Sequence, residues 1–179
     1  MNNSIRVAFC GIITALGTIL MFATGLISIG TYALPALAGV LSILIVVEMG
    51  AKWAWPVYVA TSVLSLLLAA DKEAAILYAV FFGFYPILKA YIERLHKKAL
   101  VYLIKSAAFI AAMILDFFII IYILRVPQAS FTIMGVYLPW VFLAVGIVVF
   151  YIYDFAVSGL VVLYYQRFHK TLGRWLHTK

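Results

Sequence analysis

The chain has 179 residues, of which 68% are hydrophobic and 11% are charged, and its formal net charge is +7. A soluble domain has roughly 25% charged residues, so this composition excludes a water-soluble globular fold and predicts an all-α integral membrane protein. The length suffices for about six spans of about 20 residues each. We therefore expect residues 1–179 to form a single transmembrane domain.

Six apolar runs are long enough to cross the hydrocarbon of a bilayer. We place these spans at about 7–26, 32–49, 53–70, 73–92, 101–124 and 137–165. The connections between them are short, so sequential helices should pack as antiparallel neighbours in a compact six-helix bundle. The first run follows Arg6 as a signal peptide would, but its length and the lack of an A-x-A cleavage site before Tyr32 favour a retained span.

Lys and Arg residues are divided unevenly between the two sides of the predicted bundle. With a cytoplasmic N-terminus, eleven of these bases lie on the inner side and only Lys72 and Arg125 on the outer side. This positive-inside pattern supports an even number of spans, with both termini in the cytoplasm. We interpret the net charge as an orientation signal that contacts anionic lipid headgroups in a cell membrane, and not as a nucleic-acid surface.

The first span carries small residues at helical spacing. Ala8, Gly11 and Ala15 recur at intervals of three and four residues, which places them on one face of the helix. Such a face allows another helix to approach closely. The pattern leaves open whether that partner is a helix of this chain or of another subunit.

The outer turn between the third and fourth spans contains three charged residues in a row. Asp71 is placed to cap the fourth helix, and Glu73 favours the positive end of the same helix. Lys72 lies between them and is a candidate contact for an anionic solute.

A proline and a lysine interrupt the end of the fourth span. Pro86 removes the backbone hydrogen bond to the Phe82 carbonyl, so we expect a kink there. Four interpretations are open for Lys89: an ion pair with Glu93 one turn later, an ion pair with Glu48, an amine that reaches the membrane interface, or a gating or coupling role in which the kink at Pro86 sets where the amine points.

Asp116 and Asp154 each lie well inside an apolar span, where a charged group costs about 2.5–3.5 kcal/mol to insert. Asp116 shares a helical stripe with Lys105 and Ala112, and Asp154 shares one with Phe150, so both carboxyls should point into the bundle. They line a polar pocket for a solute or a proton, they form structural pairs with a buried base or tyrosine, or they are protonated acids that each donate one hydrogen bond.

Aromatic side chains in the outer half are candidates for stacking on a planar solute. These candidates are Tyr32, Tyr78, Tyr122 and Tyr137.

The sequence contains little that predicts an enzyme. All three histidines lie in basic inner segments without metal-ligand spacing, and no G-x-x-x-x-G-K-[ST] loop is present. We expect no catalytic activity, no metal and no cofactor.

The chain resembles the substrate-binding S components of energy-coupling factor transporters, which take up vitamins and related micronutrients in prokaryotes. The resemblance rests on the length, the six spans, both ends inside, and Gly11-x-x-x-Ala15 where that family typically has A-x-x-x-A. It implies a solute site near the outer face of a prokaryotic plasma membrane protein. It also implies a transmembrane coupling subunit, contacted by Ala8, Gly11 and Ala15, and two cytoplasmic ATPases.

We therefore predict a membrane-embedded subunit that binds a vitamin-like micronutrient for uptake. Its predicted substrate-binding residues are Asp116, Asp154, Lys72 and the four tyrosines. One alternative is a self-contained oligomeric carrier or channel for a small solute or cation that uses Asp116 and Asp154 as its path. Another is a membrane scaffold subunit that does not transport.

Overall fold

A computed structural model describes the backbone of residues 3–26, 30–125, 132–133, 136–137 and 139–167. The helices and strands, in chain order, are α1 (Asn3–Ala23), η1 (Thr24–Leu26), α2 (Gly30–Met49), α3 (Ala51–Leu68), α4 (Lys72–Leu77), the π-helical turn η2 (Tyr78–Phe82), α5 (Tyr85–Ile92), α6 (Lys98–Tyr122), β1 (Thr132–Ile133), β2 (Val136–Tyr137) and α7 (Pro139–Arg167). The two short strands pair antiparallel.

Six of the helical segments in the described residues are long and apolar enough to cross a membrane. They cover 3–26, 30–49, 51–68, 72–92, 98–122 and 140–166. The six predicted spans are therefore confirmed as helices, with ends that differ by a few residues. We call the two ends of the bundle inner and outer, after the sides that the basic residues predict.

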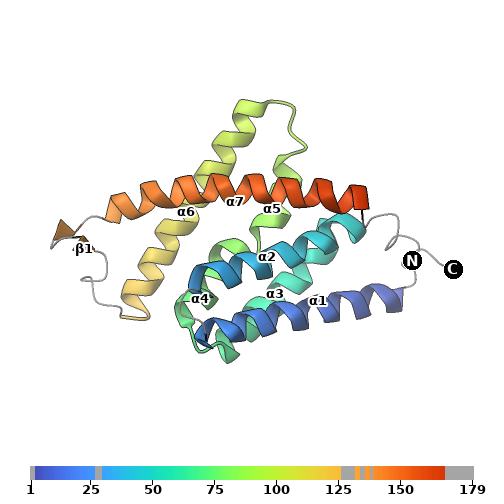
Figure 1. The fold of residues 1–179 in the computed structure, drawn as a ribbon, viewed down its shortest axis with the longest axis horizontal. Coiled ribbons are helices and arrows are strands. Elements are labelled where there is room, and N and C mark those ends of the chain that lie inside the picture. The colour runs from blue at the N-terminus through green and yellow to red at the C-terminus, as the bar shows by residue number, and fades with distance from the viewer. Residues whose placement is uncertain (1–2, 27–29, 126–131, 134–135, 138, 168–179) are drawn as a thin grey trace.

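The helices form one bundle, in which α1, α2 and α3 pack together and α6 crosses α7 at a steep angle (Figure 1). α2 is central, because it contacts α1, α3, α4, η2 and α5. Small buried residues on α2, including Ala38, Gly39 and Ser42, permit this close packing. The start of α1 and the end of α7 lie toward the same end of the bundle (Figure 1).

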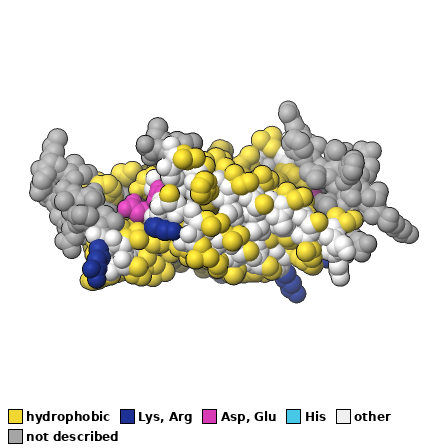
Figure 2. Space-filling view, turned by 90° about the horizontal axis from the view of Figure 1, so that it is seen from below, with side chains coloured by type: hydrophobic (Ala, Val, Ile, Leu, Met, Phe, Trp, Pro, Cys, Tyr) yellow, Lys and Arg dark blue, Asp and Glu magenta, His cyan; other side chains and the backbone are white. Residues whose placement is uncertain are grey.

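Apolar side chains cover the outside of the bundle. Figure 2 shows one face, whose described part is mostly hydrophobic with few charged side chains. Phe155 on α7 is 81% exposed and Trp140 is 75% exposed, and many Val, Leu and Ile side chains are also exposed. An apolar surface of this extent is expected for helices in contact with lipid.

The fourth span is interrupted near its middle. α4 continues into η2, and α5 begins at Tyr85 with Pro86 in its first turn. Pro86 has no N–H to donate to the Phe82 carbonyl. That carbonyl oxygen faces α2, where a Cβ on Gly39 would lie 2.4 Å from it. The interruption predicted at Pro86 is therefore present, and the altered backbone packs against a glycine.

Asp71 caps α4, as the sequence predicts. Its Oδ1 accepts a hydrogen bond from the Ala74 backbone N–H at 3.1 Å, and its Oδ2 accepts one from Thr31 Oγ1 at 2.8 Å. The same carboxylate therefore closes the start of α4 and joins that helix to α2.

Replacing Asp71 with alanine is expected to lower the free energy of unfolding by about 1 kcal/mol, because the cap is lost. Thermal unfolding of the protein in detergent measures this change. Lys72→Ala is the neighbouring control and should have a smaller effect, because the hydrogen bond of the Lys72 amine to the Leu66 carbonyl is exposed. Equal melting temperatures for Asp71→Ala and the original protein would contradict the capping role.

Candidate functional site

Asp154 lies at the centre of a buried ion network. Its carboxylate accepts hydrogen bonds from Lys105 Nζ at 3.0 Å to each oxygen, from the Tyr85 hydroxyl at 2.5 Å, and from Lys89 Nζ. Lys89 is 4% exposed, Lys105 is 3% exposed and Asp154 is 7% exposed. The network thus joins α5, α6 and α7 in the interior of the bundle.

Glu93 completes the ion network at its inner end. Its Oε1 lies 2.9 Å from both Lys89 Nζ and Lys105 Nζ. The network, which we define as Lys89, Glu93, Lys105 and Asp154, therefore contains two positive and two negative groups. Because the charges balance, neither buried lysine is left alone in an apolar environment. Ser158 Oγ also lies 2.8 Å from the Lys89 amine.

Of the interpretations open for Lys89, the ion pair with Glu93 is present. The sequence did not predict the second ion pair of Lys89, which is with Asp154. Glu48 instead accepts a hydrogen bond from the Tyr164 hydroxyl at 2.5 Å. For Asp154, the structure places a base and a tyrosine against a carboxylate that was also predicted to bind substrate. Its hydrogen bonds show how the chain itself stabilises this buried charge.

The pKa of Glu93 is set by two opposing effects. Partial burial alone would raise it, but hydrogen bonds from Lys105 and Lys89 outweigh burial and lower the pKa below its ordinary value of 4.5. A lowered pKa in the folded protein means that ionised Glu93 contributes stability above its unfolded-state pKa. This contribution is lost as the pH falls through the lower, folded-state pKa.

We therefore expect Glu93→Gln to reduce stability near neutral pH and to reduce the loss of stability on acidification below pH 4.5. Melting temperatures of both proteins across this pH range measure the difference. Parallel curves for the two proteins would contradict the contribution of Glu93. The effect should be modest, because the Glu93 side chain is 46% exposed to solvent.

Asp116 is in a different environment from Asp154. It is buried on α6 with 9% exposure, and its Oδ1 has no hydrogen-bond partner among the described residues. Lys105 shares its helical face, but eleven residues of helix separate the two by about 16 Å. The lysine on this face pairs with Asp154, and no base of the described residues pairs with Asp116.

The outer ends of two other helices lie near the helix that carries Asp116. α4 contacts both α6, which carries Asp116, and α2, which carries Tyr32. Glu73 is in the first turn of α4, and Asp71 accepts a hydrogen bond from Thr31 at the start of α2. Asp116 and Tyr32 of the predicted site therefore lie on two helices that both contact α4.

The remaining predicted site residues lie elsewhere. Lys72 is exposed, and its amine donates a hydrogen bond to the Leu66 carbonyl at the end of α3. Tyr78 is fully buried within the bundle. Tyr122 is 73% exposed and its ring stacks on Phe118 of the same helix. Tyr137 belongs to β2, and its side chain lies outside the described residues.

The small residues of α1 face outward. Ala8, Gly11 and Ala15 are all exposed, and a Cβ on Gly11 would meet nothing within 4 Å. Among the described residues, no helix of this chain covers this face at Gly11. The close contact with another helix of this chain, one of the two possibilities that the sequence leaves open, is therefore absent at Gly11 among the described residues.

A small cavity of about 200 Å³ adjoins the ion network. Lys89, Glu93 and Arg94 contribute its charged lining, and the rest is mostly apolar. Its volume is below the roughly 300–1,000 Å³ of pockets that hold drug-sized molecules. It lies at the inner end, whereas the resemblance implies a site near the outer face.

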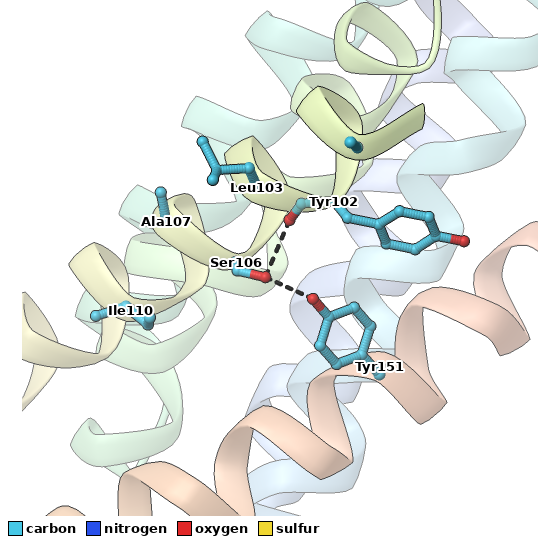
Figure 3. A pocket seen from close by; sticks show the side chains of 7 residues that line it. Tyr102, Leu103, Ser106, Ala107, Ile110 and Tyr151 are labelled. Carbon is cyan, nitrogen blue, oxygen red and sulfur yellow. Dashed lines mark hydrogen bonds between the residues drawn. The ribbon is translucent and has the colours of Figure 1, made fainter. Parts of the chain in front are cut away.

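A shallow groove of about 460 Å³ lies between α6 and α7 (Figure 3). The hydroxyls of Ser106 and Tyr151 lie 2.5 Å apart within it, and Ser106 also donates to the Tyr102 carbonyl at 2.9 Å. The groove is open to the surroundings of the bundle, and none of the predicted site residues lines it. We therefore place the candidate site at Asp116 and not in this groove.

Within the described part of the chain, no three His, Cys, Asp or Glu side chains are grouped closely enough to hold a metal ion.

Sequence reasoning missed the identity of the central partners of Asp154, which are Lys105 and Tyr85. The helical stripe that links Lys105 to Ala112 predicts which face of its helix the lysine lies on, but no spacing along the chain indicates contact between α6 and α7.

Comparison of the chain with family models, curated proteins and solved structures finds no match.

Proposed function

We propose that this chain is a membrane-embedded subunit that binds a small, vitamin-like solute for uptake. In this proposal, a separate transmembrane coupling subunit and cytoplasmic ATPases supply the energy. The sequence resemblance to the S components of energy-coupling factor transporters motivates this assignment.

The observation that carries the proposal is the unpaired carboxylate oxygen of Asp116. Buried polar atoms in folded proteins are nearly always hydrogen-bonded, to protein, water or ligand. An acid inside an apolar span is expensive to retain without a function. Asp116 Oδ1 is buried and has no partner among the described residues, so a solute that donates a hydrogen bond would satisfy it.

The exposed face of α1 supports the need for a second subunit. Ala8, Gly11 and Ala15 present a small-residue surface that the described helices leave uncovered at Gly11. In a bilayer such a surface permits close packing with a helix of another protein. This is the face that the resemblance assigns to the coupling subunit.

The environment of Asp154 argues against the carrier alternative. A proton or cation path through both aspartates needs Asp154 to exchange its partners. Asp154 is held by two lysines and a tyrosine, so a cation entering there would meet two positive charges. Uptake by the purified protein alone in liposomes would favour the carrier over the proposed subunit.

Gentle purification followed by mass spectrometry tests the proposal. The protein is extracted from its native membrane in mild detergent, and its co-purifying small molecules and proteins are both identified. We expect one enriched small molecule, which is lost in Asp116→Asn, together with a membrane subunit and ATPases. The small molecule is lost because the amide of the variant cannot supply the carboxylate charge.

Glu93→Gln is the matched control, because it also converts an acid to an amide but lies at the inner end of the bundle. This variant should retain the small molecule. The same small-molecule content in the original protein and in Asp116→Asn would contradict the proposed role of Asp116. Purification without any enriched small molecule would contradict solute binding itself.

A further inference from the structure

The acidic groups near Asp116 indicate the charge of the solute. Thr31 Oγ1 donates to Asp71 Oδ2 at 2.8 Å, which holds the start of α2 against the start of α4. Glu73 follows Asp71 in the first turn of α4. α4 also contacts α6, which carries Asp116. The carboxylates of Glu73 and Asp116 therefore belong to two helices that are in contact.

The nearby bases do not neutralise these acids. The Lys72 amine is turned to the Leu66 carbonyl, 2.9 Å away. Arg125 is exposed and makes no ion pair with an acid of the described chain. Lys105 lies three helical turns from Asp116, within the ion network. In the part of the chain that the structure describes, neither Asp116 nor Glu73 therefore forms an ion pair with a base.

Burial of Asp116 makes this feature more than a surface cluster of acids. More than nine-tenths of the residue is hidden, and Oδ1 is fully enclosed without a hydrogen-bond donor among the described residues. An anionic solute would be repelled by the carboxylate of Asp116, while a neutral one would leave this buried charge without an opposite charge. A cationic group supplies both the missing donor and the opposite charge.

Two features favour an organic cation over a metal ion. The described acids are not grouped closely enough to form a three-ligand metal site. Tyr32 is 70% exposed at the start of α2, next to Thr31, which donates a hydrogen bond to Asp71 at the start of α4. An exposed tyrosine ring at this end of the bundle can bind an ammonium group through its face.

We infer that the solute carries a positively charged amine, which Asp116 binds by a hydrogen bond and Glu73 attracts. This inference rests on the proposed function, since it names the chemical class of the solute. It also gives different tasks to the two buried acids: Asp154 stabilises the bundle, and Asp116 binds the amine.

Three probes of the same shape and different charge test the inference: tyramine, 4-ethylphenol and 4-hydroxyphenylpropionate. Choline and putrescine extend the test to other amines. The melting temperature of the purified protein is measured with each probe at millimolar concentration. At about ten times its Kd, a bound amine should raise Tm by about 3–5 °C. We expect this rise with at least one cation, and no rise with the neutral or the anionic probe.

Asp116→Asn should abolish the rise, and Glu73→Gln should reduce it, whereas Glu93→Gln should keep it. A rise that persists in Asp116→Asn, a rise with the anionic probe, or no rise with any of the three cations would overturn the inference. The co-purified solute distinguishes this failure from that of the proposed function. A retained neutral or anionic solute overturns only the cationic assignment, while the absence of any retained solute overturns the proposed function as well.

Discussion

Replacing Asp154 with asparagine is expected to lower the free energy of unfolding by about 3–5 kcal/mol, the range for breaking a buried ion pair. The amide removes one negative charge and leaves Lys89 and Lys105 sharing only Glu93. Both lysines are almost fully buried, so water cannot replace the lost partner. Thermal unfolding in detergent and the amount of folded protein in the membrane measure this loss.

A charge-balanced double variant separates the ion network from other effects of the substitution. Asp154→Asn combined with Lys105→Met leaves one lysine, Lys89, and one carboxylate, Glu93, so the charges of the network balance again. This double variant should regain part of the stability lost in the single variant. Phe155→Leu is the positional control, because Phe155 adjoins Asp154 in sequence but is 81% exposed. A double variant less stable than Asp154→Asn alone would show that charge balance does not govern this site.

Gly39→Ala is expected to destabilise the bundle by about 1–3 kcal/mol, because it overpacks the contact between α2 and the interrupted fourth span. The new Cβ would lie 2.4 Å from the Phe82 carbonyl oxygen and 3.2 Å from the Tyr153 hydroxyl. The first of these atoms is backbone, so no change of rotamer can relieve the overlap. The two elements would have to separate.

Gly159→Ala is the matched control, since a Cβ there meets nothing within 4 Å. Alanine is also the better helix former, so this variant should be as stable as the original protein or slightly more stable. The melting temperatures of the two variants give the comparison. If Gly39→Ala and Gly159→Ala had the same melting temperature, the close approach of Phe82 to α2 would be refuted.

Hydropathy alone predicted the six helices, because a run of about 20 apolar residues has few other stable structures. The helical stripes also predicted that Asp116 and Asp154 face inward, and both are buried. Both predictions depend on local patterns, which repeat every three or four residues along one helix.

The partners of the two acids were not predictable in the same way. Lys105 shares a stripe with Asp116, yet it pairs with Asp154 on another helix. That choice depends on the rotation and crossing of α6 and α7, which side-chain packing sets and sequence spacing does not. Tyr122 illustrates the same limit. Its position at the outer end of α6 does not indicate whether its ring faces the bundle or the surface, and the structure shows a residue that is 73% exposed.

The account depends on the difference between the two acids, with Asp154 satisfied by the chain and Asp116 satisfied by a solute. An experimental structure of the protein, purified gently from its native membrane into lipid, tests this difference most directly. We expect a bound molecule within hydrogen-bond distance of Asp116 Oδ1, and only Lys89, Lys105 and Tyr85 at Asp154. A side chain of the same protein bonded to Asp116 Oδ1, with no bound molecule at the outer end, would contradict the account.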